Sequence, residues 1–115
     1  MRLEIRGRGL EITAAMREHL TRRLGFALGR FGDRVTHVTA RMTDANGPRG
    51  GVDKQVRLSV GVRANASVVI EDADTDLYAA IDRGAERAGR AVARVLDRDR
   101  GFRGTAGVRA GEAGA

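Results

Sequence analysis

Residues 71–100 have the longest helical periodicity in the chain and constrain its fold more than any other stretch. Their apolar positions recur every three or four residues, which places them on one narrow helical face that we expect to be buried. These positions are Leu77, Ile81, Gly84, Ala88, Val92 and Val95. Arginines repeat with the same spacing, about 130° around the helix from the centre of that face. This arginine ridge consists of Arg83, Arg87, Arg90, Arg94 and Arg98.

The two acids within this helix, Asp82 and Glu86, lie on the flank opposite the ridge. We therefore expect the ridge to be uncompensated, whereas a solvated helix without a partner more often mixes its charges at i and i+4. Arginine binds phosphate through two parallel hydrogen bonds, so the pattern favours contact with RNA over an ordinary solvated face.

The charge balance also indicates a polyanionic partner. The 115 residues suffice for one domain with its own core. They include 21 Lys and Arg against 15 Asp and Glu, a net charge of +6, and only Lys54 is a lysine. Genomic base composition would explain the preference for arginine over lysine, but it would not explain the excess of cations. Phosphate neutralisation does explain it.

Several classes of function lack support in the sequence. There is no cysteine, and the two histidines, His19 and His37, are not at metal-ligand spacing, so we expect no disulfide, metal or cofactor. The glycine-rich segments 7–9 and 47–51 lack the P-loop pattern, and no nucleophile motif is present, so we expect no enzyme. Aromatic residues make up 3% of the chain, which gives little support for an aromatic base-stacking platform. Residues 1–12 contain no apolar run long enough for a signal peptide or a membrane span, so we expect a cytoplasmic protein.

The remaining periodicities predict four strands and one more helix. Alternation predicts strands over 2–6, 35–42, 54–63 and 66–70, with glycines 7 and 9 ending the first. Thr13 is the expected N-cap of a helix whose apolar face is Met16, Leu20, Leu24, Ala27 and Phe31. In that helix, Gly25 and Gly29 require close packing against another element to be tolerable. Ala64 and Asn65 predict a tight turn, residues 44–53 a loop, and Asp74 or Thr75 the cap of the last helix.

The predicted order is β-α-β-β-β-α, an α+β fold. We expect a two-layer sandwich in which a four-stranded mixed sheet carries both helices on one face, their outer surfaces forming a continuous basic wall. The predicted domain spans residues 1–100. Residues 101–115 are rich in glycine and alanine without periodicity, which predicts a disordered tail.

Two stretches resemble a known family. They are LEIRGRGLEITAAMREHL at residues 3–20 and EDADTDLYAAIDRGAERAGRAV at residues 71–92, where Asp76 to Asp82 match the signature D-[LM]-Y-A-A-I-D. These residues are similar to those of the ribosome hibernation promoting factor and ribosome-associated inhibitor family, also called sigma modulation proteins. The chain resembles the short form, because a glycine- and alanine-rich tail stands where long members carry a domain that pairs ribosomes.

The resemblance implies a factor that binds the small (30S) ribosomal subunit in the channel for messenger and transfer RNA and holds the ribosome idle under stress or in stationary phase. It also implies that the basic surface of both helices lies against ribosomal RNA. By position this surface comprises Arg22, Arg23, Arg30, Arg83, Arg87, Arg90 and Arg94, and the ridge adds Arg98. We expect a monomer when free, with no membrane and no small-molecule substrate as partner.

Two other functions fit the element order. A general double-stranded RNA-binding module shares the α-β-β-β-α segment, but the acidic start of the last helix stands where such modules place lysines. A protein-interaction or homodimer module would use the open sheet face. That face would present Thr39, Arg41, Gln55, Arg57 and Ser59. It is too polar for a large obligate interface.

Overall fold

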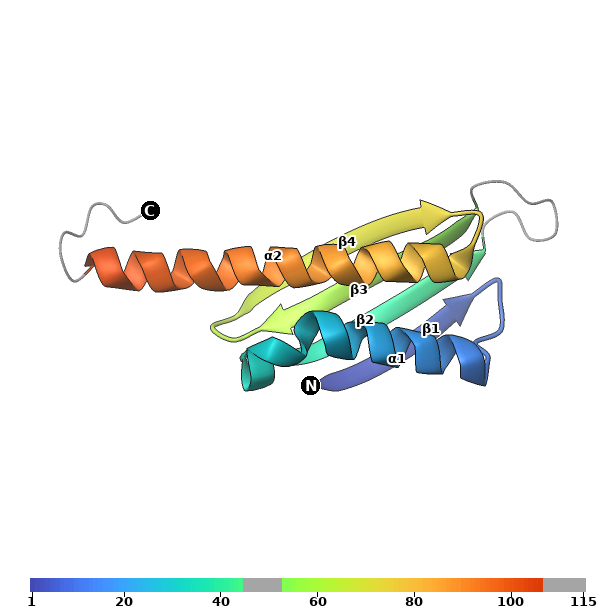
Figure 1. Ribbon diagram of the computed structural model, residues 1–115, viewed down its shortest axis with the longest axis horizontal. Helices are drawn as coiled ribbons and strands as arrows, with labels where there is room; N and C mark the ends of the chain where they lie inside the picture. The colour runs from blue at the N-terminus through green and yellow to red at the C-terminus, as the bar shows by residue number, and fades with distance from the viewer. Residues whose placement is uncertain (45–52, 107–115) are drawn as a thin grey trace.

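The computed structural model of the chain describes residues 1–44 and 53–106, and side chains as far as Arg98 (Figure 1). The predicted element order is confirmed. The elements are β1 (Arg2–Arg8), α1 (Ala14–Leu28), a 3₁₀ helix η1 (Gly29–Arg34), β2 (Val35–Asp44), β3 (Lys54–Val62), β4 (Ala66–Asp74) and α2 (Leu77–Ala106).

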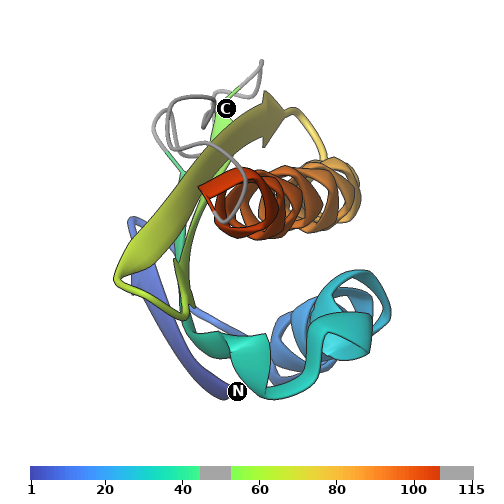
Figure 2. The same cartoon turned by 90° about the vertical axis from the view of Figure 1, so that its left-hand side faces the viewer.

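The four strands form one mixed sheet in the order β1-β2-β3-β4. β1 runs parallel to β2, and the other two neighbouring pairs are antiparallel. Figures 1 and 2 show both helices on the same side of the sheet. The predicted two-layer α+β sandwich is therefore confirmed, and the other face of the sheet is open.

The core lies between the sheet and the helices. Alternate residues of β2 and β3 face inward, among them Val38, Ala40, Met42, Val56, Leu58 and Val60. The helices cover them with Leu20, Leu24 and Leu28 of α1 and Ile81, Ala88 and Val92 of α2. Both predicted apolar helix faces are thus buried, as the i, i+4 spacing requires.

β1 is longer than predicted, because Gly7 belongs to the strand instead of ending it. Gly7 pairs with Met42, and a Cβ atom there would lie 2.8 Å from the carbonyl oxygen of Leu10 and 2.9 Å from the side chain of Ile12. The strand ends at Arg8, before Gly9 with φ +77°. Here glycine marks a close approach of the chain as well as a turn.

The predicted turn between β3 and β4 is confirmed. Ala64 and Asn65 have φ of 68° and 63°, both in the left-handed region, and lie between the paired residues Val62 and Ala66. The predicted N-cap of α1 is confirmed too, because the Thr13 hydroxyl accepts a hydrogen bond from the Met16 amide at 3.1 Å. For α2 the predicted cap is wrong: Asp76 accepts from the Tyr78 amide at 3.0 Å, while Asp74 accepts from the Asp76 amide.

The helix α2 continues past residue 100 to Ala106, so the predicted domain boundary falls inside a helix. The rest of the predicted tail, 107–115, and loop residues 45–52 lie outside the described residues, and the division into domain and tail stays a prediction. Within the described part of the chain, no helix is long and apolar enough to cross a membrane.

Candidate nucleic-acid interface

The two helices touch most closely where Gly89 of α2 meets Ala27 of α1. A Cβ atom on Gly89 would lie only 2.8 Å from the Ala27 carbonyl oxygen. The helix α1 does pack closely on another element, as predicted, but Gly25 and Gly29 do not form the contact, because a Cβ there would meet nothing within 4 Å. The glycine that permits the contact lies on the other helix.

Beside this contact the helices enclose a shallow inter-helix groove. It is lined by Arg23, Phe26, Ala27, Arg30, Ala85, Glu86, Gly89 and Arg90. Three arginines, one each from α1, η1 and α2, therefore border one surface hollow. The only carboxylate among its lining residues is Glu86, whose Oε2 is 3.4 Å from Arg90 Nη1 in an exposed i,i+4 pair. Such exposed pairs are weak, and an RNA phosphate can replace the carboxylate.

Arg23 is held at the groove by Asp82. The Asp82 carboxylate lies 3.3 Å from Arg23 Nε and 2.7 Å from His19 Nε2. The His19 and Tyr78 rings pack edge to face, with their centroids 4.9 Å apart. Asp82 thus holds an arginine and a histidine of α1, while Asp76 caps the start of α2. On the other side, the Arg30 guanidinium lies 4.7 Å from the centre of the Phe31 ring, a cation–π contact.

Phe26 is a functional candidate that the sequence analysis missed. Its side chain is 74% exposed although it is a large aromatic, and it lies in the groove between Arg23 and Arg30. The missed signal is positional: Phe26 follows Arg23 by three residues and precedes Arg30 by four, so all three share one helix face. An exposed aromatic ring among arginines suits an unpaired nucleobase.

The first half of the arginine ridge is compensated, contrary to expectation. Arg83 Nη2 is 2.8 Å from Asp72 Oδ1, 2.9 Å from Asp74 Oδ2 and 3.0 Å from the Ala73 carbonyl oxygen. Arg87 Nη1 is 3.2 Å from Asp72 Oδ2 and 2.8 Å from the Glu71 carbonyl oxygen. The compensating acids come from β4, so counting acids within the helix could not reveal them.

These contacts shift the ionisation of the acids. Burial opposes ionisation of Asp72, but hydrogen bonds from Arg83 and Arg87 outweigh it and hold the pKa of Asp72 below its usual value. A hydrogen bond from the Asp76 amide and another from Arg83 lower the pKa of Asp74. The same hydrogen bonds from Arg83 to Asp72 and Asp74 raise the pKa of Arg83. Arg83 and Arg87 therefore attach α2 to β4.

The remaining predicted residues are exposed: Arg22, Arg94 and Arg98 have no ion pair among residues 1–44 and 53–98. Figure 1 shows that the last turns of α2 project beyond the sheet. The predicted continuous wall thus divides into three parts. Arg23, Arg30 and Arg90 border the groove, Arg83 and Arg87 bind β4, and the other three are free in solvent.

Residues 3–100 match the model of the family described as sigma 54 modulation protein / S30EA ribosomal protein. The chain belongs to this family. It is 29% identical to the N-terminal domain of Thermus thermophilus Protein Y, with a TM-score of 0.70, over 83% of this chain and 99% of that one. A ribosomal subunit interface protein from Coxiella burnetii has the same fold, with a TM-score of 0.69 and 16% identity over 84% and 99% of the two chains. No curated protein gives a significant match.

As a member of the S30EA family, the chain is a ribosome-associated factor. The structure gives the signature at residues 76–82 a physical role. Asp76 caps α2, whereas Leu77, Ala80 and Ile81 are buried beneath it. Asp82 fixes Arg23 at the groove. The signature therefore builds the junction of the two helices and orients a basic side chain.

Among the described residues, no three His, Asp or Glu side chains are grouped as metal ligands.

Proposed function

We propose that the chain binds the small (30S) ribosomal subunit through its ribosomal RNA, in the channel that otherwise holds messenger and transfer RNA. In doing so it holds the ribosome idle under stress or in stationary phase. It acts in the cytoplasm as a monomer, without cofactor or catalysis. Membership of the S30EA family supports the ribosome as partner.

The inter-helix groove is the observation that carries the RNA contact. Arg23 of α1, Arg30 of η1 and Arg90 of α2 converge on it, and Phe26 is exposed beside them. Guanidinium groups bind phosphates while an aromatic ring stacks on a base, so the groove suits a folded RNA with unpaired nucleotides better than a plain duplex. The free Arg22, Arg94 and Arg98 extend the basic surface along both helices.

Co-sedimentation with purified small subunits tests this proposal. The complex should form at about 50 mM salt and dissociate towards about 200 mM, since phosphate contacts release counterions. The triple variant R30Q/R90Q/R94Q should lose binding and no longer inhibit translation in a reconstituted system. Binding by this variant equal to that of the unmodified chain would refute the assignment of the groove. Equal affinity for any RNA duplex would instead indicate a general double-stranded RNA-binding module.

A further inference from the structure

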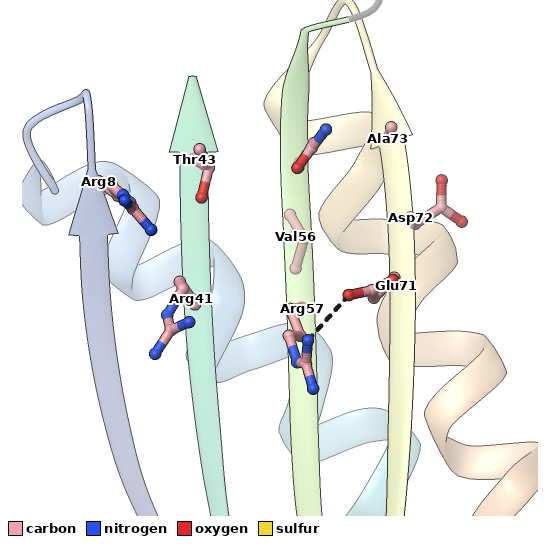
Figure 3. Close-up of a pocket in the computed structure, with 9 residues that line it drawn as sticks. Arg8, Arg41, Thr43, Val56, Arg57, Glu71, Asp72 and Ala73 are labelled. Carbon is pink, nitrogen blue, oxygen red and sulfur yellow. Dashed lines mark hydrogen bonds and ion pairs between the residues drawn. The ribbon is translucent and has the colours of Figure 1, made fainter. Parts of the chain in front are cut away.

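The open face of the sheet carries a second set of cations, on the side of the molecule opposite the helices. Arg6 of β1 pairs in register with Arg41 of β2, and Arg41 with Arg57 of β3. Neighbouring strands are about 4.8 Å apart, so three guanidinium groups follow one row across the sheet. Arg8 lies one pleat further along β1, opposite Thr43. Figure 3 shows Arg8, Arg41 and Arg57 on successive strands with the helices behind the sheet. Together the four arginines form the sheet-face cluster.

The fold does not require this row. Like charges directly opposite each other destabilise a sheet, and Arg41 has arginine neighbours on both sides. The next row of the same face contains Thr39 and Ser59, which shows that uncharged polar residues are accommodated there. A row of three repelling cations is favourable only when an anion lies over it.

The carboxylates of this face neutralise only two of the four arginines. Glu4 is paired with Arg6 at 2.7 Å, and Glu71 with Arg57 at 3.1 Å (Figure 3 shows the second pair). Arg8 and Arg41 have no ion pair within the part of the chain that the structure describes. A hollow of about 460 Å³ lies over these strands. It is lined by Arg8, Arg41, Thr43, Gln55, Val56, Arg57, Glu71, Asp72 and Ala73. Both acids already have arginine partners, since Glu71 pairs with Arg57 and Asp72 with Arg83 and Arg87.

We propose that the sheet-face cluster binds the phosphodiester backbone of a second RNA segment, so that the protein contacts RNA on both of its faces. This inference rests on the proposed function and adds a second contact to it. A linear row of guanidinium groups matches a linear polyanion, and Thr43 and Gln55 offer further donors to phosphate oxygens.

A protein partner is less compatible with this face. Protein interfaces concentrate aromatic and other large apolar side chains at their centre. Of the large apolar side chains exposed in the described residues, Val69 alone lies on the open face of the sheet. Cations without apolar anchors are typical of backbone contacts to nucleic acid.

The decisive variant is R8Q/R41Q, because these two arginines have no intramolecular ion pair to lose. The control R17Q/R63Q removes the same charge away from both the cluster and the inter-helix groove. It also loses one exposed ion pair, between Arg63 and Asp33, which contributes little to stability. The variant R8K/R41K keeps the charge without the bidentate geometry. Thermal unfolding of all three should match that of the unmodified chain, since exposed substitutions shift stability little.

Native mass spectrometry with single-stranded RNA oligonucleotides of about 12 nucleotides counts the binding faces. The unmodified chain and R17Q/R63Q should hold two oligonucleotides per protein, whereas R8Q/R41Q should hold one. On small subunits, R8Q/R41Q should bind about tenfold more weakly. A plot of log affinity against log salt should also be less steep for R8Q/R41Q, by about 1.4. This is the change expected when two contacts to single-strand phosphates are lost.

The outcomes separate this inference from the proposed function. If the unmodified chain binds small subunits but R8Q/R41Q and R17Q/R63Q behave alike, the sheet-face site is wrong while the proposed function stands. If the unmodified chain binds no small subunits, both are wrong. If polyglutamate displaces RNA from the helix variant R30Q/R90Q/R94Q more strongly than polyuridylate does, the occupant is an acidic protein and the inference fails. Partial binding by R8K/R41K supports it.

Discussion

Asp72 of β4 accepts a bidentate contact from Arg83 of α2, with Oδ1 2.8 Å from Nη2 and 3.2 Å from Nε. The Asp72 side chain is only 10% exposed, so this ion pair is largely shielded from water. Its second oxygen accepts from Arg87. One carboxylate therefore fastens two successive turns of α2 to the edge strand of the sheet.

We expect Asp72→Asn to lower the free energy of unfolding by about 1–2 kcal/mol at pH 7, since it removes charge-assisted hydrogen bonds. The pKa of Asp72 is lowered in the folded chain, so its stabilisation is present above the unfolded pKa of about 4 and is lost as pH falls through the folded value. Urea unfolding between pH 7 and pH 2 should thus show a weaker acid dependence for the variant. An unchanged pH profile would contradict this role of the pair.

Two arginines of α2 should have different roles, Arg83 in stability and Arg90 in binding. Arg83→Gln should reduce stability, because Asp74 loses its ion pair and Asp72 keeps only the one with Arg87. Arg90→Gln should leave the melting temperature unchanged, since it loses only an exposed i,i+4 pair. Small-subunit binding should respond more to Arg90→Gln when both variants are compared at a temperature where each is folded. The reverse ranking would show that Arg83 leaves Asp72 to contact RNA.

Phe26→Ala should weaken binding to small subunits about tenfold, the range expected for loss of one base stack. Stability should stay within about 0.5 kcal/mol, because the ring is 74% exposed. Phe26→Tyr keeps an aromatic ring and should bind normally. If Phe26→Leu binds as well as the unmodified chain, the contact is apolar and no base is stacked.

Gly89→Ala should destabilise the chain by about 1 kcal/mol, because the overpacking cost exceeds the gain in helix propensity. The new Cβ would lie 2.8 Å from the Ala27 carbonyl oxygen, so the helices must move apart and the groove must widen. Gly25→Ala is the matched control. It lies in open space within α1 and should stabilise the chain by up to about 1 kcal/mol. Equal effects of both variants would show that the helices do not pack closely at Gly89.

Local sequence patterns were enough to predict the order of the elements, the inward faces of strands and helices, the turn at Ala64–Asn65 and the Thr13 cap. Each depends on residues only a few positions apart, so periodicity and turn chemistry are enough to predict it. The family signature could also be recognised in the sequence, because residues 76–82 are contiguous.

The tertiary structure was needed to show which arginines are bound within the fold. Arg83 meets Asp72 and Asp74 because the rotation of α2 over the sheet brings its flank to β4. The row from Arg6 to Arg57 exists because strand register aligns three segments distant in the chain. Ion pairs and charged rows between elements depend on register and helix rotation, which the burial of the whole core sets. These contacts between elements therefore cannot be predicted from a local sequence pattern.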